Sequence, residues 1–367
     1  MLIINNADVQ KILDMNVCLE ALDGVFQELA KGEAVSMGRI DLYVPSQRSD
    51  NPFYRWSVMS GGSRKDHLVC TRMMSDVVAW TRSYGHMRED KYAREPGTYC
   101  GFMLLFSTED AQPLAIINDG VLQHLRVGGG AGLGVKYLAR QDSETVGMIG
   151  SGGMARTYLA AICAVRKIRH VKVYSPNRGN VLAFAEDMRR RHDLEVQPVQ
   201  SARESVRGVD IAAACTSTAE PVFFTEWLEP GMHFTNVTSS EIEPSLVDTV
   251  DIAIRAGQLT ERLAVMRPHH TNGRSGFLGY VAGRPEERAL VPNLNLPDAI
   301  VGLPSLVDLL TGRVSGRTSD HQVTFFLNAG EIGAQFAALA AIVYRGALDR
   351  GLGKEFPTEY FLENIRD

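Results

Sequence analysis

The spacing of apolar side chains changes along the chain, and each change predicts a different kind of structure. In the first 30 residues apolar positions recur at intervals of three and four, which indicates an amphipathic helix that Asp8 caps and Gly32 ends. From Ser36 to Leu122, short apolar runs alternate with turn residues, which is typical of short strands. Two of these runs flank the polar segment Ser107–Gln112 and predict a β-hairpin.

Helical spacing returns in two further segments. Leu122 to Ala139 has the pattern of one long helix, although three consecutive glycines, Gly128 to Gly130, lie inside it. Each glycine costs about 1 kcal/mol relative to alanine in a helix interior. Either a neighbouring helix or a ligand must therefore approach this backbone closely. The segment from Asp320 to Arg350 is also predicted to be helical, with small residues throughout Ala334–Ala341.

Two long polar stretches show no period. Asp76 to Gly97 is polar and bears aromatic residues, and we predict a loop there. A loop of this length in a compact domain is usually functional or mobile. Met266 to Pro292 is rich in glycine, proline and arginine, and we predict an inserted loop. Both stretches are expected to shape a substrate pocket.

From Thr145 onwards apolar strands alternate with helical segments. Helices are expected after the first strand as far as Val165, and again from Asn180 to His192. This alternation predicts an α/β fold with a doubly wound parallel sheet. The predicted strands are Val146–Ile149, Val171–Tyr174, Glu195–Val199, Asp210–Cys215, Met232–Val237 and Asp251–Ile254.

Composition narrows the class of protein. A chain of 367 residues suggests about two domains. The net charge of −5 argues against nucleic acid as a partner, and the basic run Arg189–Arg191 is interpreted as the solvated end of a helix. No apolar run reaches the ~20 residues that span a bilayer. The five cysteines are scattered without metal-ligand spacing, which favours reduced thiols in a cytoplasmic protein without a metal site.

A glycine turn carries the most specific chemistry. The run Gly150-Ser151-Gly152-Gly153-Met154-Ala155 follows an apolar strand and opens a helix, with a second strand at the distance of a βαβ unit. In such a turn Gly150 permits the tight bend, Gly152 lets the backbone approach a pyrophosphate, and Ala155 keeps the helix close to the sheet. The N-terminus of the helix offers unpaired N–H groups to the phosphates. We therefore predict a nicotinamide dinucleotide site, against the alternative of a purely structural turn.

The residues after the second strand bear on the choice of coenzyme. A site for NAD usually has a carboxylate there to bind the ribose 2′-hydroxyl. This chain has Ser175 instead, with Arg178 close by, which suits a 2′-phosphate and favours NADP(H) over NAD(H). Arg178 could equally be an ordinary surface residue. Thr216 and Val237, at the ends of later strands, are expected where the nicotinamide crosses the edge of the sheet.

A series of short runs follows in order along the chain: Pro113–Gly120, His124–Arg126, Lys136–Arg140, Val146–Arg156, Gly208–Ile211, Glu226–Gly231 and Gly316–Ser319. Together these runs resemble the ornithine cyclodeaminase/mu-crystallin family. The resemblance covers nearly the whole chain and is specific from about Gly97 to Pro230. It implies a central Rossmann-type domain, residues 123–317, and a second α+β domain for substrate binding and dimerisation, residues 1–122 and 318–367. A homodimer is expected on the same ground.

Several positions match the family's substrate residues. Arg39 and Arg126 fall where the family has arginines for a substrate carboxylate, and Thr98 matches a threonine beside the substrate. The guanidinium fork suits a carboxylate on independent grounds. The family's lysine near the reacting carbon is replaced by Arg72, which can orient a substrate but will not deprotonate. Asp76 follows four residues later and could pair with Arg72 in a structural ion pair or act as an acid/base group.

A second departure weakens one family reaction. Cyclodeaminases have an aspartate after the strand that ends at Val237, where it binds the side-chain amine of the substrate. Here Ser240 is closest to that position. The proton donor is therefore left open among Asp76, His86, Lys91 and Ser240 acting with water.

These observations favour an NAD(P)H-dependent imine or ketimine reductase, or an amino-acid dehydrogenase, acting on a small carboxylate-bearing imino or amino acid. Two alternatives stay open. One is an ornithine cyclodeaminase-type ammonia lyase that recycles its NAD internally. The other is a crystallin-type protein that binds NADPH and a small molecule without turnover.

Overall fold

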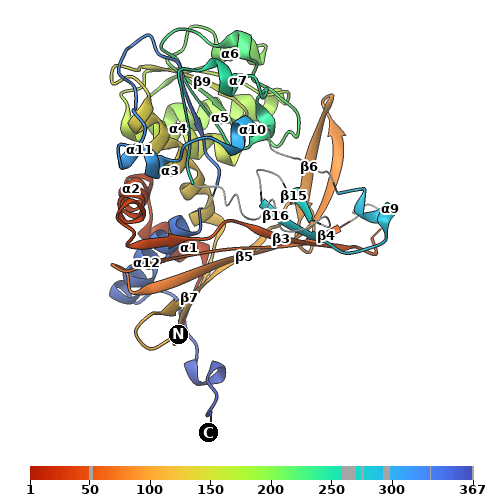
Figure 1. The fold of residues 1–367 in the computed structure, drawn as a ribbon, viewed down its shortest axis with the longest axis vertical. Coiled ribbons are helices and arrows are strands. Elements are labelled where there is room, and N and C mark those ends of the chain that lie inside the picture. The colour runs from red at the N-terminus through yellow and green to blue at the C-terminus, as the bar shows by residue number, and fades with distance from the viewer. Residues whose placement is uncertain (49–52, 258–269, 274–276, 292–297, 331, 366–367) are drawn as a thin grey trace.

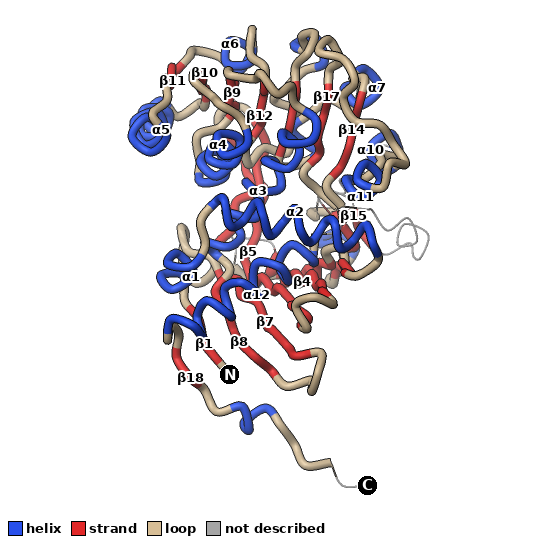
Figure 2. Tube along the Cα trace, turned by 90° about the vertical axis from the view of Figure 1, so that its left-hand side faces the viewer, coloured by secondary structure: helices blue, strands red, loops and turns tan. Residues whose placement is uncertain are grey.

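The computed structural model describes residues 1–48, 53–257, 270–273, 277–291, 298–330 and 332–365. Figure 1 shows two units stacked along the long axis, with a parallel sheet in the upper one and a broad, curved sheet in the lower one. We call them the parallel sheet and the large sheet. The long helices α2 (Met15–Lys31), α3 (Gly120–Leu138) and α12 (Gly333–Arg350) lie between them or against the large sheet (Figure 2).

The parallel sheet confirms the predicted doubly wound α/β fold. Its strands run in the order β11-β10-β9-β12-β13-β17-β14, and every neighbouring pair is parallel. Separate clusters of buried apolar side chains cover its two faces. The strands are β9 (Thr145–Ile149), β10 (His170–Tyr174), β11 (Glu195–Pro198), β12 (Ile211–Ala214), β13 (His233–Asn236), β14 (Ile252–Arg255) and β17 (Thr324–Leu327), and the first two crossover helices are α4 (Gly153–Val165) and α5 (Arg178–His192).

The strand order reverses between β9 and β12. Strands β10 and β11 lie on one side of β9, whereas β12 and β13 lie on the other. The loops that leave the carboxyl ends of β9 and β12 therefore diverge and leave a crevice. In open α/β sheets this is where ligands bind.

The large sheet mixes antiparallel and parallel pairs. Its main order in the described residues is β15-β16-β3-β4-β5-β7-β8-β1-β18, while β2 pairs with β4 and β6 with β5. The antiparallel pair β7–β8 confirms the predicted hairpin. The strands are β1 (Leu2–Ile4), β2 (Ala34–Ser36), β3 (Ile40–Pro45), β4 (Phe53–Ser63), β5 (Leu68–Ser83), β6 (His86–Tyr92), β7 (Cys100–Ser107), β8 (Pro113–Asn118), β15 (His270–Gly273), β16 (Phe277–Val281) and β18 (Lys354–Glu355).

The N-terminal helix predicted from Asp8 to Gly32 is in fact two helices. The first, α1 (Asn6–Ile12), is capped by the side chain of Asn5, so Asp8 lies in its first turn. Leu13 is extended, and the Asp14 carboxylate then accepts the N–H of Val17 and starts α2. Gly32 ends α2 as predicted, in a left-handed conformation at φ 73°.

The Asp76–Gly97 stretch is not a loop but mainly a hairpin. Strand β5 continues to Ser83, and β6 returns antiparallel to it after two residues, Tyr84 and Gly85. Both have positive φ, 53° and 84°, as in the type I′ turn that matches the twist of paired strands. We call residues 77–92 the arm. Figure 1 shows it standing away from the large sheet towards the parallel-sheet unit.

Three other predictions differ from the structure. The segment predicted as an inserted loop, Met266–Pro292, lies partly outside the described residues, but it contains β15, β16 and the short helix α9 (Pro285–Arg288). Strand β16 pairs with β3, so residues expected in the Rossmann-type domain join the large sheet. Conversely, β17 belongs to the parallel sheet, between β13 and β14, although it lies beyond the expected boundary at residue 318. This segment was also expected to be helical, but it forms a strand whose residues are all buried.

The glycines of α3 resolve the question of what approaches that helix. A Cβ at Gly128 would lie 2.4 Å from the backbone oxygen of Thr157 in α4, and one at Gly129 would lie 2.8 Å from Leu22 in α2. Close packing of helices therefore requires these glycines.

In the described part of the chain, no helix combines the length and apolar character needed to cross a membrane.

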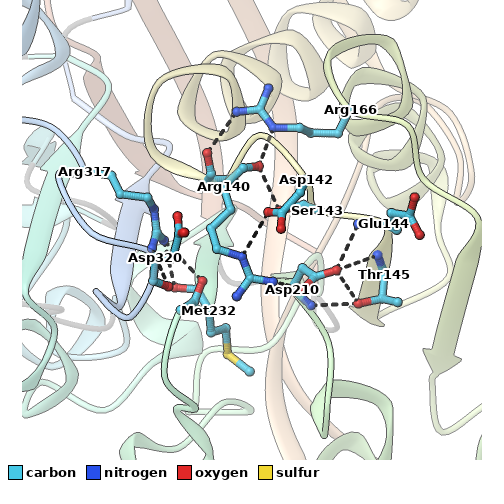
Figure 3. A network of polar contacts seen from close by, with 12 residues as sticks. Arg140, Asp142, Ser143, Glu144, Thr145, Arg166, Asp210, Met232, Arg317 and Asp320 are labelled. Carbon is cyan, nitrogen blue, oxygen red and sulfur yellow. Dashed lines mark hydrogen bonds and ion pairs between the residues drawn. The ribbon is translucent and has the colours of Figure 1, made fainter.

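A polar network joins α3 to the amino ends of β9 and β12 (Figure 3). The Asp210 carboxylate accepts the backbone N–H groups of Glu144 and Thr145 at 2.9 and 3.0 Å, the Thr145 hydroxyl, and a guanidinium N–H of Arg140. Nearby, the Arg166 guanidinium donates to the backbone oxygens of Val135 and Ala139 and so satisfies the end of α3. This network lies at the end of the parallel sheet opposite the crevice.

Replacing Asp210 with asparagine is expected to lower the free energy of unfolding by about 2–3 kcal/mol at pH 7, because two N–H groups and Arg140 lose a charged acceptor. Burial alone would raise the pKa of Asp210, but these donors together lower it. A carboxylate whose pKa is lowered by folding stabilises the protein at pH values above its unfolded pKa, near 4. This stabilisation is lost as the pH falls from there through the folded-state pKa. Urea titrations should therefore show the difference at pH 7 and a smaller one at pH 3.5.

Candidate coenzyme and substrate sites

The glycine turn has the geometry that a pyrophosphate requires. Gly150 has φ 110°, and a Cβ there would lie 2.3 Å from the backbone oxygen of Cys215. Gly152 is the N-cap of α4, and a Cβ at this position would meet no atom within 4 Å. The protein therefore leaves open space above the N-terminus of α4. Its first N–H groups face that space without a side-chain cap.

The open space belongs to a cleft of about 870 Å³. Two predicted coenzyme residues outside the glycine turn, Ser175 and Thr216, line this cleft, whereas Val237 and Arg178 do not. Arg178 is exposed in the first turn of α5. Asn177 and Asn180, which sequence reasoning did not select, line the cleft instead.

The tip of the arm forms one wall of this cleft. Ser83, Tyr84, His86 and Arg88 are among the lining residues. The N–H of Ala219, in the loop after β12, donates to the backbone oxygen of Met87 at 2.8 Å. Both sheets therefore contribute to the same cleft, which the prediction of a loop at 76–97 could not specify.

A buried carboxylate joins the ends of β12 and β13. One oxygen of Glu241 accepts the N–H and the hydroxyl of Thr216 at 2.6 and 2.7 Å, and the other accepts the N–H of Val237 at 2.8 Å. Burial raises the pKa of Glu241 to about 7, and these hydrogen bonds oppose the shift. Thr216 and Val237 thus hold each other in place through Glu241. The neighbouring Ser240 hydroxyl donates to the backbone oxygen of Thr218 at 3.1 Å.

Two buried arginines contact the same aromatic ring. The Arg72 and Arg126 side chains are 2% and 5% exposed, and each guanidinium carbon lies 4.9 Å from the centroid of Phe336 in α12. Arg72 donates to Asp119 at 2.6 Å and to the Tyr99 hydroxyl at 2.7 Å. The sequence indicated both arginines, but not Tyr99, Asp119 or Phe336.

Arg126 has no carboxylate partner among the described residues. One terminal nitrogen donates to Gln123 at 2.8 Å, while Nε has no hydrogen-bond partner. Burial, and then the charge of Arg72, lower the pKa of Arg126 to about 9. Asp119 Oδ1 and both amide atoms of Gln335 are also buried without partners. A buried cation without an anion is costly, so the site is suited to a polar, anionic ligand.

The other substrate and catalytic residues predicted near this site bind partners other than Arg72 and Arg126. Arg39 binds Asp41 at 2.6 Å and Ser57 at 2.9 Å. Both oxygens of Asp76 bind Arg55 at 2.9 Å, so the ion pair of Asp76 is with Arg55 and not with Arg72. The Thr98 hydroxyl turns back to the backbone oxygens of residues 93 and 95.

Comparison with protein-family models gives one match over most of the chain. The model of the ornithine cyclodeaminase/mu-crystallin family matches residues 3–350. A Δ1-pyrroline-2-carboxylate reductase of Bacillus cereus is 28% identical over 70% of this chain and 74% of its own. An alanine dehydrogenase of Archaeoglobus fulgidus is 24% identical over 96% and 97%. An ornithine cyclodeaminase of Agrobacterium fabrum is 24% identical over 79% and 77%.

Solved structures share the whole architecture. The Δ1-pyrroline-2-carboxylate reductase of Thermococcus litoralis, in complex with NADH and L-proline, superposes with a TM-score of 0.75 at 23% identity, covering 97% of this chain and 100% of the other. An archaeal alanine dehydrogenase dimer with bound NAD gives a TM-score of 0.73 at 21% identity, covering 97% and 99%. At these identities the likeness establishes the fold.

Proposed function

Because the chain belongs to the ornithine cyclodeaminase/mu-crystallin family, we propose that it is a nicotinamide-dependent enzyme acting on a small, carboxylate-bearing imino or amino acid. In this proposal it reduces a C=N bond, or oxidises the corresponding CH–NH₂ group in the reverse direction. The observation that carries the proposal is Arg126, a buried cation that lacks a carboxylate partner among the described residues and lies next to Arg72.

The cleft at the glycine turn holds the coenzyme. The pyrophosphate fits the open space at Gly152, where the first N–H groups of α4 point. A bound nicotinamide dinucleotide supplies or accepts the hydride. The ends of β12 and β13, fixed by Glu241 through Thr216 and Val237, support the nicotinamide half.

The two buried arginines hold the substrate. Arg126 and Arg72 bind its carboxylate, and the Phe336 ring, which both guanidinium groups contact, keeps water away from the bound carboxylate. Water exclusion strengthens each charged hydrogen bond. Fixing one end of a small substrate in this way orients the reacting carbon, and orientation alone is worth several kcal/mol of the barrier. Arg39, committed to Asp41 and Ser57, acts at the margin of the site.

Cyclodeamination is the second candidate, and the cyclodeaminase relative favours it. That reaction needs an acceptor for a side-chain ammonium group after β13. The Ser240 hydroxyl donates to Thr218, and the adjacent Glu241 is buried among four donors from the protein. Neither provides a free carboxylate, so we place this reaction second. A crystallin-type binder without turnover stays the third, and the charged substrate site argues against it.

The proposed coenzyme is NADP(H). Ser175 lines the cleft at the end of β10, and Arg178 begins α5 two residues beyond Pro176. Replacing Arg178 with alanine is expected to weaken NADPH binding about 5- to 10-fold, which corresponds to one exposed charge-assisted contact, and to leave NADH binding unchanged. Fluorescence titration with each coenzyme checks this. Equal affinities for NADPH before and after the substitution would remove Arg178 from the site.

We also propose a homodimer formed through the outer face of the large sheet. Exposed apolar side chains gather on this face, opposite the buried arginines, and one relative is an alanine dehydrogenase dimer. Light scattering at micromolar concentration should give twice the mass of one chain. The exposed side chains are Val35, Leu42, Val44, Tyr54, Val69 and Phe106.

One assay distinguishes the three functions. A panel of amino acids, and of keto acids with amines and cyclic imino acids, is followed at 340 nm with NADH and NADPH separately, with ammonia measured in parallel. A net absorbance change supports the reductase or dehydrogenase. Ammonia release without one supports the cyclodeaminase. Coenzyme binding without either would leave the binding protein.

A further inference from the structure

Lys91 lies on the face of the large sheet that carries the buried arginines. Strand β6 pairs with β5 so that Lys91 is opposite Val78. Since side chains alternate along a strand, Lys91, Asp76 and Arg72 share one face. The prediction of a loop at 76–97 had left Lys91 without a defined place.

A single aromatic ring separates Lys91 from the arginine pair. Its Nζ lies 6.0 Å from the ring centroid of Tyr99, and the hydroxyl of that ring accepts a hydrogen bond from Arg72. Lys91 is accessible to solvent. Among the described residues, no side-chain or backbone oxygen lies within hydrogen-bond or ion-pair distance of its ammonium group, which instead faces the Tyr99 ring.

The charges around Lys91 do not neutralise it. Arg39 precedes β3, Arg55 is on β4, Asp76 on β5 and Glu89 on β6. The Arg55 guanidinium binds Asp76 with two nitrogens and Glu89 with the third, at 2.9 to 3.0 Å. The nearby carboxylates are therefore already compensated. Desolvation by the protein atoms around the ammonium group, and then the charge of Arg55, lower the pKa of Lys91 to about 8, although the residue keeps contact with solvent.

Reduction of a C=N bond needs a proton on nitrogen as well as a hydride on carbon. The arginines of the site do not release protons near neutrality. Asp76 is fully buried with both oxygens bound to Arg55. His86 lies at the arm tip beside Glu220, and the Ser240 hydroxyl is a far weaker acid than an ammonium group. An amine that titrates near the working pH is well matched to this task.

We propose that Lys91 is the proton donor of the reaction, with the substrate carboxylate held by Arg126 and Arg72. This inference rests on the proposed function. In the reductive direction a proton passes from the Lys91 ammonium to the imine nitrogen, and hydride from the reduced coenzyme forms the new C–H bond. The C=N π bond breaks, the substrate gains two electrons, and the coenzyme is oxidised. Neutral Lys91 then regains its proton from water, and in the oxidative direction it accepts the proton.

The test compares Lys91→Gln with the wild type and with the control Lys65→Gln, which removes an exposed lysine in the turn between β4 and β5. Losing a general acid is expected to lower kcat/KM of reduction about 100- to 1,000-fold. Coenzyme affinity, measured by fluorescence, should change less than about twofold. Added primary amines should restore part of the activity of Lys91→Gln, which a purely structural residue would not allow.

The pH profile supplies an independent readout. In the wild type, kcat/KM of reduction should fall as the pH rises through about 8, because Lys91 loses its proton. This limb should be absent in Lys91→Arg, whose charge is retained. If Lys91→Gln keeps its activity, or the limb persists in Lys91→Arg, the donor is another group. If the wild type turns over nothing on the substrate panel, the proposed function falls, and the inference falls with it.

Discussion

Replacing Arg126 with methionine is expected to lower kcat/KM for carboxylate substrates strongly while leaving the fold at least as stable. The wild-type guanidinium is buried, lacks a carboxylate partner among the described residues, and has an unsatisfied Nε. Its removal therefore relieves a desolvation cost in the empty protein. The substrate, however, loses two charge-assisted hydrogen bonds of about 1.5–3 kcal/mol each, so kcat/KM should fall at least about 100-fold.

The matched control is Arg166→Met. Arg166 is buried to a similar degree, 7% against 5% exposed, but its guanidinium binds several backbone oxygens at the end of α3. This substitution should lower the melting temperature and leave kcat/KM of the folded enzyme within a fewfold of the wild type. Thermal unfolding and steady-state kinetics on the same samples separate the two effects. A large loss of stability in Arg126→Met would show that Arg126 is structural.

Replacing Gly152 with valine is expected to remove coenzyme binding without disturbing the fold. A Cβ added there meets no protein atom within 4 Å, so the position has room for a side chain in the protein itself. The same space must receive the pyrophosphate, whose distance to the N–H groups of α4 sets its affinity. The dissociation constants for NADH and NADPH should rise at least about 100-fold. Calorimetric titration with both coenzymes measures this.

Two other glycines make the result interpretable. Gly24 in α2 also has open space around it, so Gly24→Val should leave coenzyme binding unchanged. Gly150→Ala should instead destabilise the protein, because its Cβ would lie 2.3 Å from the backbone oxygen of Cys215 at a φ of 110°. If Gly152→Val binds either coenzyme as the wild type does, the cleft at the glycine turn is not the coenzyme site.

The parallel sheet was predictable because its strands are short, apolar and separated by helices of clear period. The arm was not. Its second strand carries His86, Arg88, Glu89, Asp90 and Lys91, and most of these residues are only partly buried. Such a strand shows no apolar alternation, since its polar groups pair with one another and with the facing unit. The one local signal, a Tyr-Gly turn, is weaker than Asn-Gly or Asp-Gly.

In the substrate site, the sequence pointed only to residues that match family positions. Arg72 and Arg126 were identified by their resemblance to family positions. Phe336 was not, because α12 brings it to Arg126 from more than 200 residues away along the chain. Tyr99 follows Thr98 directly, and the backbone turn after residue 93 decides which of the two side chains reaches Arg72.

The interleaving of the two sheets has a consequence for synthesis of the protein. Strand β1, which is synthesised before the other described strands, pairs with β18 near residue 355, and β3 pairs with β16 near residue 280. The parallel sheet is likewise incomplete until β17 arrives. Both sheets therefore stay incomplete until strands from the later part of the chain have been synthesised. Fragments cut at residue 122 or 318 would each lack strands of both sheets, so expression of separate halves should yield aggregation-prone chains.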